Sequence, residues 1–414
     1  MKTRTMYTSI AALAALSMVA AACGGDDDAD SVADVADDAG DDAADVADSV
    51  VEAVEDVADS VADVASDIAC DTPDQVSLQL QWFTQAQFAG YYAADAEGYY
   101  DDMCLDVTIV EGGVEIVPQT QLANGDADFA ISWVSKALAS REAGADIVNI
   151  AQVFGRSGTL QVSFADAGIT SPDDFAGKTI GNWGFGNEYE VFAALGQAGL
   201  DPADDVELVG QQFDMVALLD GSIDAAEAMT YNEYAQVLEA VNPDTGELYQ
   251  PEDFNVVNYT DEGVGMLQDA IWADAARLAD DAEYRDIAVR FVAASLQGWG
   301  YCRDNVQSCT DIVLEAGPQL GASHQLWQMN EINKLIWPAD EGVGRIVEAD
   351  WNQTVELSLN TPNLEGSTVL TEDPGDGAYT NEIVDEALSM LGGDFDANGS
   401  GYEPMEVTLE EGGN

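Results

Sequence analysis

Hydrophobic and polar positions along residues 76–154 switch repeatedly between a two-residue period and a helical period. The segments with the pattern of strands are Val76–Trp82, Cys104–Glu111, Asp128–Trp133 and Ile147–Phe154. The helical segments between them are Phe88–Glu97, Val117–Asn124 and Val134–Ala143, each with a glycine just past its end, where glycine is common. Strands that alternate with helices predict an α/β fold.

A second strand-helix series begins at Lys178–Gly181, and the pattern turns mainly helical after Asn255–Tyr259. The clearest late helices are Asp281–Gln297 and Gly321–Ile336. This order predicts two α/β lobes joined by a hinge, with a ligand cleft between them. The chain would enter the second lobe near Thr159–Phe164 and return near Val256–Tyr259. We assign residues 164–259 to the second lobe, and residues 70–163 and 260–414, with C-terminal helices and a tail, to the first.

Residues 1–22 have the pattern of a bacterial lipoprotein signal peptide. Lys2 and Arg4 precede the apolar run Ile10–Ala22, which is too short to span a bilayer of roughly 30 Å. Small residues then lead to Cys23, as in a lipobox, where the cysteine becomes the lipidated first residue of the mature chain. Plain secretion with an incidental cysteine is the alternative. We expect an exported protein, anchored by lipid to the outer face of the cytoplasmic membrane.

Residues 23–69 form an acidic low-complexity segment dominated by Asp, Ala and Val, without basic or aromatic residues. Such a segment cannot bury enough apolar surface to fold alone, which predicts a solvated stalk. Its apolar residues from Val46 to Ile68 recur at spacings of three and four, which would line one face of a helix. A transient coiled coil between neighbouring copies is therefore the alternative.

The whole chain carries 79 Asp and Glu against 12 Lys and Arg, and the excess continues beyond the stalk. A nucleic-acid backbone requires clustered basic residues, so this balance excludes an ordinary nucleic-acid binder. Because concentrated salt screens repulsion between like charges, we interpret the acidity as adaptation to a saline environment.

Four further cysteines follow the stalk, and in an exported chain they are expected to form disulfides. We favour the pairs Cys70 with Cys104 and Cys302 with Cys309. The second pair closes a short loop, and the first would attach the incoming chain to an early strand. A four-thiolate zinc site is the competing interpretation, although the spacings are unlike paired zinc knuckles.

Several motifs in residues 75–410 resemble one family of transport proteins. They are QWFTQAQFAGYY (residues 81–92), EGYY (97–100), QLANGDADF (121–129), GNWGFGNE (181–188), MTYNEY (229–234) and WQMNEINKLIWP (327–338). The chain resembles solute-binding proteins of ABC importers, in the group that binds thiamine pyrimidine precursors and riboflavin and includes sulfonate-binding and thiamine pyrimidine synthase-like proteins. The resemblance implies a type II periplasmic-binding-protein fold, delivery of ligand to a membrane permease, and a flat heteroaromatic ligand.

The candidate ligand-binding residues agree with that implication. Three tryptophans, Trp82, Trp133 and Trp183, lie at the carboxyl ends of predicted strands, the edge that faces the ligand crevice in open α/β sheets. Tyr231 has a similar place in the second lobe, and Phe88 and Tyr91 belong to the first motif. Aromatic faces can sandwich a planar ring, while polar side chains can satisfy its nitrogens or an amino group. The polar candidates are Gln85, Asn187, Glu188 and Glu233.

Each candidate also has a purely structural interpretation. The tryptophans could pack between the lobes, and Glu188 could favour the start of the next helix. Gly184 and Gly186 give room for close backbone approach rather than a phosphate loop, since the G-x-G-x-x-G spacing is absent. We therefore favour a ligand without phosphate.

The resemblance to thiamine pyrimidine synthase raises an enzymatic alternative. Such an enzyme should have a cysteine-rich iron-associated motif, a suitably placed histidine and a lysine for the cofactor aldehyde. The only histidine is His324, far in sequence from the early pocket segments. We interpret His324 as structural or as a helix-surface residue, and expect no catalytic residue and no cofactor.

One further motif, Asp394–Glu403, begins like a calcium loop, with acids or amides at alternate positions and Gly399 sixth. Position twelve is Met405 rather than a bidentate Glu, so a turn rich in Asp, Asn and Gly is the simpler interpretation, and we assign no metal.

The sequence as a whole predicts a monomeric, lipid-anchored, extracytoplasmic solute-binding subunit that closes two lobes on a small heteroaromatic vitamin precursor. A thiamine pyrimidine precursor, such as hydroxymethylpyrimidine or formylaminopyrimidine, is the favoured ligand, and riboflavin or a sulfonate-like solute is the alternative. Its partners would be the permease and ATPase subunits of an importer.

Overall fold

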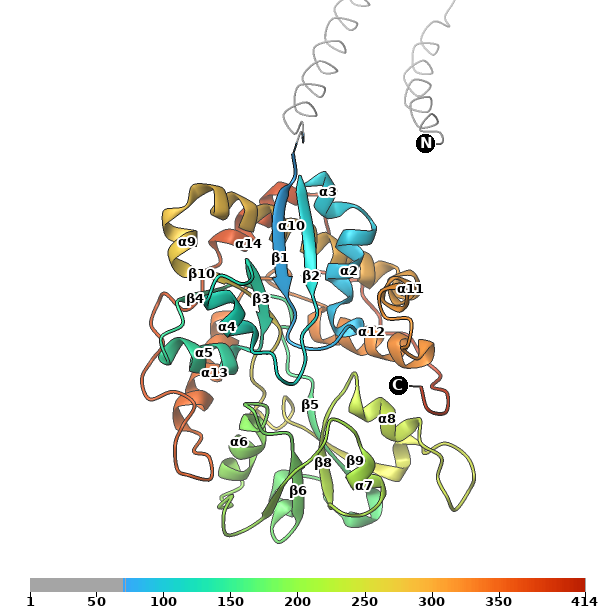
Figure 1. Ribbon diagram of the computed structural model, residues 1–414. Helices are drawn as coiled ribbons and strands as arrows, with labels where there is room; N and C mark the ends of the chain where they lie inside the picture. Colours follow the sequence, from blue (N-terminus) through green and yellow to red (C-terminus); the bar gives the residue numbers. More distant parts are fainter. Residues whose placement is uncertain (1–69, 71, 414) are drawn as a thin grey trace, which may run out of the picture. The chain divides into compact units, whose positions relative to one another are not determined.

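Two five-stranded sheets organise the part of the chain that the computed structural model describes, which is Cys70 and residues 72–413 (Figure 1). The predicted signal peptide (1–22), the predicted lipidation site Cys23 and the predicted stalk (23–69) lie outside the described residues. Among the helices of the described residues, none combines the length and apolar character needed to cross a membrane.

The first sheet has the strand order β2-β1-β3-β10-β4. β1 runs parallel to β2 and β3, whereas β10 runs antiparallel to β3 and β4. The bounds are β1 (Asp74–Gln79), β2 (Leu105–Val110), β3 (Phe129–Ser132), β4 (Ile147–Gln152) and β10 (Ala270–Asp274). β1 follows its alternating sequence, since Val76 and Leu78 are buried and Gln75 is exposed.

The second sheet repeats this arrangement with the order β7-β6-β8-β5-β9. β6 runs parallel to β7 and β8, and β5 runs antiparallel to β8 and β9. The bounds are β5 (Thr159–Phe164), β6 (Thr179–Asn182), β7 (Glu207–Gly210), β8 (Ala225–Met229) and β9 (Phe254–Asn258).

Helices cover both faces of each sheet, and each face has its own hydrophobic core. One face of the first sheet packs against α2 (Ala89–Ala96), α10 (Ala282–Asp304), α11 (Val306–Ala316), α12 (Ala322–Ile336) and α14 (Glu382–Leu391). The opposite face packs against α4 (Pro118–Ala123), α5 (Val134–Glu142) and α13 (Glu348–Asn360). Short elements of this lobe are η1 (Ala86–Phe88), α3 (Tyr99–Asp102) and α9 (Ala275–Asp280).

In the second lobe, one core includes η3 (Pro172–Phe175) and α6 (Tyr189–Gln197), and the other includes α7 (Val216–Leu219) and α8 (Glu233–Leu238). The remaining short turns are η2 (Ala165–Ala167) and η4 (Pro251–Asp253). The mixed α/β architecture expected from the sequence is confirmed.

Two details differ from the sequence prediction. The second lobe begins at β5, before residue 164, because Thr159–Phe164 pairs along its whole length with β8 and β9. The late region is also not purely helical, since β10 returns to the middle of the first sheet. β10 consists of four buried apolar residues followed by Asp274, and such a short apolar run has no period that distinguishes a strand from a buried helix.

Glycines allow α2 and α10 to approach unusually closely. A Cβ atom at Gly298 would lie 1.9 Å from the carbonyl oxygen of Gly90, and one at Gly90 would lie 2.2 Å from the Trp299 ring. Since real contacts are never so short, larger residues at either position would force the two helices apart.

The disulfides are those expected, Cys70 with Cys104 and Cys302 with Cys309, with Cα–Cα distances of 5.4 and 5.1 Å. They use all four sulfurs, which excludes the four-thiolate zinc site. The segment suspected of resembling a calcium loop forms a turn, in which Asp396 Oδ1 accepts hydrogen bonds from the backbone N–H groups of Asn398 and Gly399.

Candidate functional site

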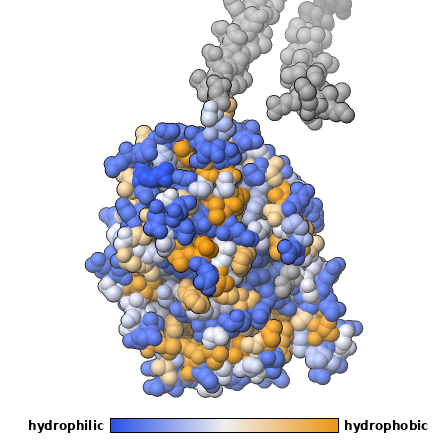
Figure 2. All heavy atoms as spheres, viewed as in Figure 1, coloured by the Kyte–Doolittle hydropathy of each residue, from blue (hydrophilic) through white to orange (hydrophobic). Residues whose placement is uncertain are grey.

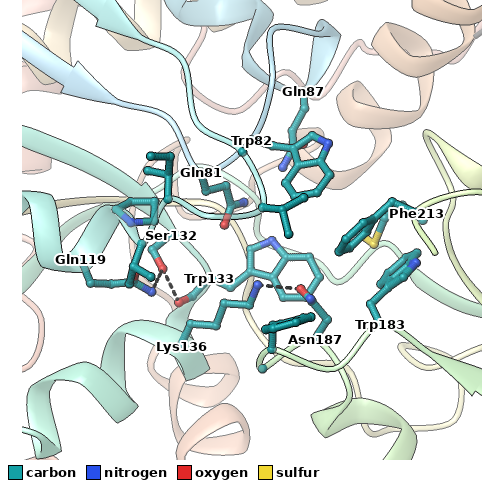
Figure 3. Close-up of a pocket in the computed structure, with 18 of the residues that line it drawn as sticks. Gln81, Trp82, Gln87, Gln119, Ser132, Trp133, Lys136, Trp183, Asn187 and Phe213 are labelled. Carbon is teal, nitrogen blue, oxygen red and sulfur yellow. Dashed lines mark hydrogen bonds between the residues drawn. The ribbon is translucent and has the colours of Figure 1, made fainter. Parts of the chain in front are cut away.

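A cavity of about 360 Å³ lies between the two lobes, at the carboxyl ends of β1, β2 and β3 on one side and of β6, β7 and β8 on the other. Figure 3 shows aromatic rings and amide side chains from both lobes directed into it. In open α/β sheets this edge is where ligands bind, because the loops that follow parallel strands converge there. Its volume falls within the range of roughly 300–1,000 Å³ typical of small-molecule sites.

The wall from the first lobe is organised around one buried carboxylate, Asp269, which directly precedes β10. Asp269 accepts hydrogen bonds from Gln81 Nε2, from Gln87 Nε2 at 2.9 Å and from Trp133 Nε1 at 2.9 Å. All three donors belong to residues that line the cavity. A single side chain thereby fixes two amides and an indole ring before any ligand arrives.

Burial raises the pKa of Asp269 to about 7, although the three hydrogen bonds and Lys136 act in the opposite direction. A carboxylate away from water loses its hydration, and only the donors around it compensate for that loss. The integrity of this wall therefore depends on the donors that reach Asp269.

Lys136, on the first helical turn after Trp133, brings a positive charge to the cavity wall. Its Nζ donates to Asn187 Oδ1 of the other lobe at 2.6 Å and lies 4.8 Å from the centre of the Trp133 ring. Burial lowers the pKa of Lys136 to about 8, while Glu188, Glu227 and Asp269 raise it. An ammonium group has three N–H donors, so Lys136 has capacity left for an acceptor on a ligand.

Aromatic side chains join the two lobes at this cavity. The Trp82 ring of the first lobe lies 4.7 Å from the Phe213 ring of the second, and Phe213 lies 6.0 Å from Trp183 with an interplanar angle of 22°. Figure 3 shows these rings on one side of the cavity and Trp133 opposite Lys136 at its centre. The arrangement suits a planar ring system, for which aromatic faces provide stacking surfaces.

Two buried polar atoms on the cavity wall have no hydrogen-bond partner within the described residues, Trp183 Nε1 and Gln119 Oε1. Gln119 uses its other amide atom, Nε2, to donate to Ser132 Oγ at 2.7 Å. Buried polar groups are almost always paired, so an unpaired acceptor on the first lobe's wall and an unpaired donor on the second lobe's wall indicate where a ligand would bind.

The second lobe contributes buried acids. Glu233 lines the cavity and accepts hydrogen bonds from the Met229 backbone N–H at 3.0 Å and from Asn232 Nδ2 at 2.8 Å. Glu227 lies on β8 and accepts from the Trp183 backbone N–H at 2.8 Å. Burial raises the pKa of both carboxyl groups.

The mouth of the cavity is apolar. Val114, Val117 and Phe185 are 46%, 50% and 81% exposed although all three line the cavity. Phe185 also has a φ of 56° between two glycines of positive φ, which is strained for an L-residue. Figure 2 shows apolar atoms exposed across the middle of the described unit, where loops of the two lobes meet.

Most of the residues proposed from the sequence lie on the cavity wall. They are Trp82, Gln85, Trp133, Trp183, Asn187, Tyr231 and Glu233. Phe88 and Tyr91 lie elsewhere: both are buried in the first lobe's core, and Tyr91 packs edge-on against Trp299 at 5.6 Å. Glu188 also lies off the wall, directly before α6, where it accepts from the Gly186 N–H at 2.8 Å.

Sequence reasoning missed several residues of the site, above all Lys136, Phe213, Gln119 and Asp269. Lys136 and Gln119 each lie within three residues of a predicted strand end or loop, which is a signal that could have found them. Nothing local marks Asp269, because it reaches the site only through the undetected strand β10.

His324 lies in α12, is 2% exposed and does not belong to the cavity wall. Its two ring nitrogens contact Glu239 and Asn232. The structural role expected for His324 fits this position, and the helix-surface alternative does not.

Comparison with known proteins identifies the fold class of the structure and the family of the chain. The fold is that of the periplasmic substrate-binding proteins. It matches a putative periplasmic sulfonate-binding protein, SsuA, from Methylobacillus flagellatus, with a TM-score of 0.54, 15% identity, and coverage of 81% of this chain and 99% of that one. It also matches the enzyme DSZB in complex with biphenyl-2-sulfinic acid, with a TM-score of 0.50, 16% identity, and coverage of 77% and 99%.

The chain belongs to the NMT1/THI5-like family, whose model matches residues 85–308. A riboflavin-binding protein, RibY, from Chloroflexus aurantiacus is 25% identical over 76% of this chain and 87% of its own length. A formylaminopyrimidine-binding protein from Halalkalibacterium halodurans is 25% identical over 58% of this chain and 70% of its own.

Proposed function

We propose that this chain is the solute-binding subunit of an ABC importer, and that it binds a small planar heteroaromatic vitamin precursor in the cavity between its lobes. The observation that carries the proposal is a cavity lined by aromatic faces from both lobes, with a free acceptor, Gln119 Oε1, on the first lobe's wall and a free donor, Trp183 Nε1, on the second lobe's wall. Stacking would provide most of the affinity, and the polar atoms would select the ring.

The ligand that we favour is a thiamine pyrimidine precursor such as hydroxymethylpyrimidine or formylaminopyrimidine. The name of the Halalkalibacterium relative supports this choice. An aminopyrimidine ring carries both an N–H donor and ring-nitrogen acceptors, which complement Gln119 Oε1 and Trp183 Nε1.

Riboflavin is the second candidate. The name of the Chloroflexus relative and the size of the cavity support it. The cavity has a volume of about 360 Å³ and an open apolar mouth, with space for a ring system larger than a pyrimidine. A sulfonate-like solute is a third, since Lys136 offers an ammonium group to an anionic ligand.

The position of His324 argues against the synthase-like alternative. In that reaction a histidine would have to reach the ring-binding site, whereas both nitrogens of His324 are engaged outside the cavity. We propose a binding protein and no enzyme, exported as a monomer, anchored through Cys23 and served by permease and ATPase subunits.

Calorimetry on the intact chain in high salt tests the function. Hydroxymethylpyrimidine, formylaminopyrimidine, riboflavin, an alkanesulfonate and pyridoxal phosphate form the panel. Stoichiometric binding of one of the first three, with unchanged protein mass, is the expected result. Binding of pyridoxal phosphate with loss of mass at His324 would overturn the proposal in favour of the synthase, and binding of no heteroaromatic ligand would overturn the ligand class.

A further inference from the structure

The helix α12 connects the hinge with both walls of the cavity. Near its carboxyl end, the Leu335 carbonyl accepts from the Gly155 N–H at 3.1 Å, in the segment that links the two sheets. A helix rises about 1.5 Å per residue, so His324 near the other end lies about 16 Å from that contact. At such a distance, a rotation of one lobe against the other displaces the contacts of His324 far more than those of Leu335.

On the side of the first lobe, α12 fixes η1, which carries Gln87 to the cavity. Gln325 Oε1 accepts from the Ala86 backbone N–H at 2.7 Å, and Gln328 Oε1 accepts from the Gln87 N–H at 3.2 Å. These bonds hold the first wall to the helix.

On the side of the second lobe, His324 makes the corresponding contacts. Its Nδ1 lies 3.1 and 3.0 Å from the two carboxylate oxygens of Glu239, and its Nε2 lies 2.9 Å from Asn232 Oδ1. Asn232 donates through Nδ2 to Glu233, so its Oδ1 must accept. Both ring nitrogens therefore donate, which only the charged imidazolium can do.

These contacts form a continuous chain to the cavity. Asn232 Nδ2 donates to Glu233 Oε1 at 2.8 Å, and both residues line the cavity. Burial raises the pKa of Glu233, and the positive charge of His324 is among the influences that lower it. Because Asn232 is held from the His324 side, Glu233 keeps one orientation.

We propose that His324 is a positioning residue for the ligand site: its imidazolium, held between Glu239 and Asn232, fixes Glu233 on the cavity wall and binds α8 to α12. This inference rests on the proposed function for its ligand readout. It also assigns a role to a histidine that the cavity itself does not use.

The C-terminal tail encloses this cluster. The Gly412 N–H donates to the Glu239 carbonyl at 3.2 Å, and the Glu410 N–H donates to Ser323 Oγ at 3.2 Å. Figure 1 shows the C-terminus beside α8 and α12. The tail therefore covers a buried ion pair, which strengthens the attraction within it.

The titratable groups on the elements packed against α12 carry both signs of charge. Acidic or phenolic groups are Glu233, Tyr234 and Glu239 at α8, Glu410 and Glu411 on the tail, Asp311 and Glu315 on α11, and Glu331 on α12, while Lys334 on α12, Arg156 in the hinge segment and the arginines of α10 are basic. A neutral imidazole has a single N–H donor and no charge, so it could not serve both Glu239 and Asn232. The contribution of His324 to the ligand site therefore depends on both ring nitrogens donating.

His324→Gln tests this with the panel ligand that the wild type binds. The quantity to compare is the ratio of the two dissociation constants at pH 6. We expect the variant to bind about tenfold more weakly than the wild type, a coupling of ordinary size. Equal affinities would overturn the proposal.

Trp327→Phe is the matched control, because Trp327 Nε1 donates to the Thr230 carbonyl at 3.0 Å and also joins α12 to the second lobe, but carries no charge. Its dissociation constant should stay within about twofold of that of the wild type, because the contacts from His324 through Asn232 to Glu233 are intact. If this control binds as weakly as His324→Gln, the loss comes from the contact between α12 and the second lobe in general, and the proposal fails.

Nitrogen NMR of the wild type, prepared without a histidine tag, needs no ligand and no folded variant. The chain has a single histidine, so every histidine signal belongs to His324. Two protonated ring nitrogens at pH 6 are expected, and a neutral tautomer at that pH would overturn the proposal. If no panel ligand binds but the imidazolium is observed, the proposed function fails while the His324–Glu239 ion pair stands.

Discussion

The two walls of the cavity are built differently. In the first lobe, Gln81, Gln87 and Trp133 all donate to the buried Asp269, and η1 is fixed to α12. In the second lobe, Trp183 Nε1 has no partner within the described residues, and Phe185 is 81% exposed in a segment of positive φ. The polar groups around Asp269 on the first wall are therefore satisfied in advance, although Gln119 Oε1 is left for a ligand there, whereas the second wall offers an unpaired indole donor and an exposed ring.

This difference assigns separate tasks to the lobes. A preorganised wall loses little conformational entropy when it binds a ring, which favours affinity. A wall with an unpaired donor and an exposed aromatic residue gains contacts only when a ligand is present, which couples binding to closure. We expect the first wall to determine stability and the second to determine how the ligand is held.

Asp269→Asn should have the largest effect. Burial raises the pKa of Asp269 from 3.8 to about 7, so the folded protein holds a proton that the unfolded chain releases between those values. The free energy of unfolding should therefore fall as pH rises from about 4 to about 7, and about 3 kcal/mol of the fall between pH 4.5 and 7.5 should be absent from the variant. Denaturant titrations at pH 4.5 and 7.5 measure it.

Glu190→Gln is the control for that prediction. Glu190 is buried in the second lobe, burial raises its pKa to about 7, and it accepts from the Met266 N–H at 2.6 Å away from the cavity wall. It should lose a similar pH dependence of stability but keep its ligand affinity. If Asp269→Asn also keeps full affinity, Asp269 does not organise the first wall.

Two indole substitutions compare the walls directly. Trp133→Phe removes a donor from Asp269, so the free energy of unfolding should fall by about 2 kcal/mol, as expected for a hydrogen bond to a charged group. Trp183→Phe removes a donor that has no protein partner, so stability should change by less than about 0.5 kcal/mol while ligand affinity falls about tenfold. Thermal unfolding measures the stability of both variants, and calorimetry measures their ligand affinity. If Trp183→Phe is destabilised but keeps its ligand affinity, the assignment of these roles to the two walls is wrong.

The sequence predicted the α/β architecture and both disulfides, and most of the ligand-binding candidates that it named lie on the cavity wall, because strand ends and cysteines are local signals. It failed where chain segments far apart determine the site. Asp269 meets Gln81, Gln87 and Trp133 only because β10 returns to the first sheet. Phe88 and Tyr91 stand in the same motif as Trp82, but the turn of η1 and α2 directs them into the core. Phe213 follows the short strand β7, which has no strong pattern.

Phe185→Gly should have the smallest effect and acts only on the second wall. Glycine adopts a positive φ freely, so loss of strain at φ 56° should raise the free energy of unfolding by up to about 1 kcal/mol. The ligand should dissociate a few times faster, because the exposed ring no longer covers the cavity mouth. Stopped-flow fluorescence measures the rate, with Val216→Ser as the control, since Val216 is 60% exposed in the same lobe but off the cavity wall. Equal dissociation rates for Phe185→Gly and wild type would mean that the Phe185 ring does not cover the bound ligand. Closure of the second lobe on the ligand would then depend on Trp183 and Phe213 alone.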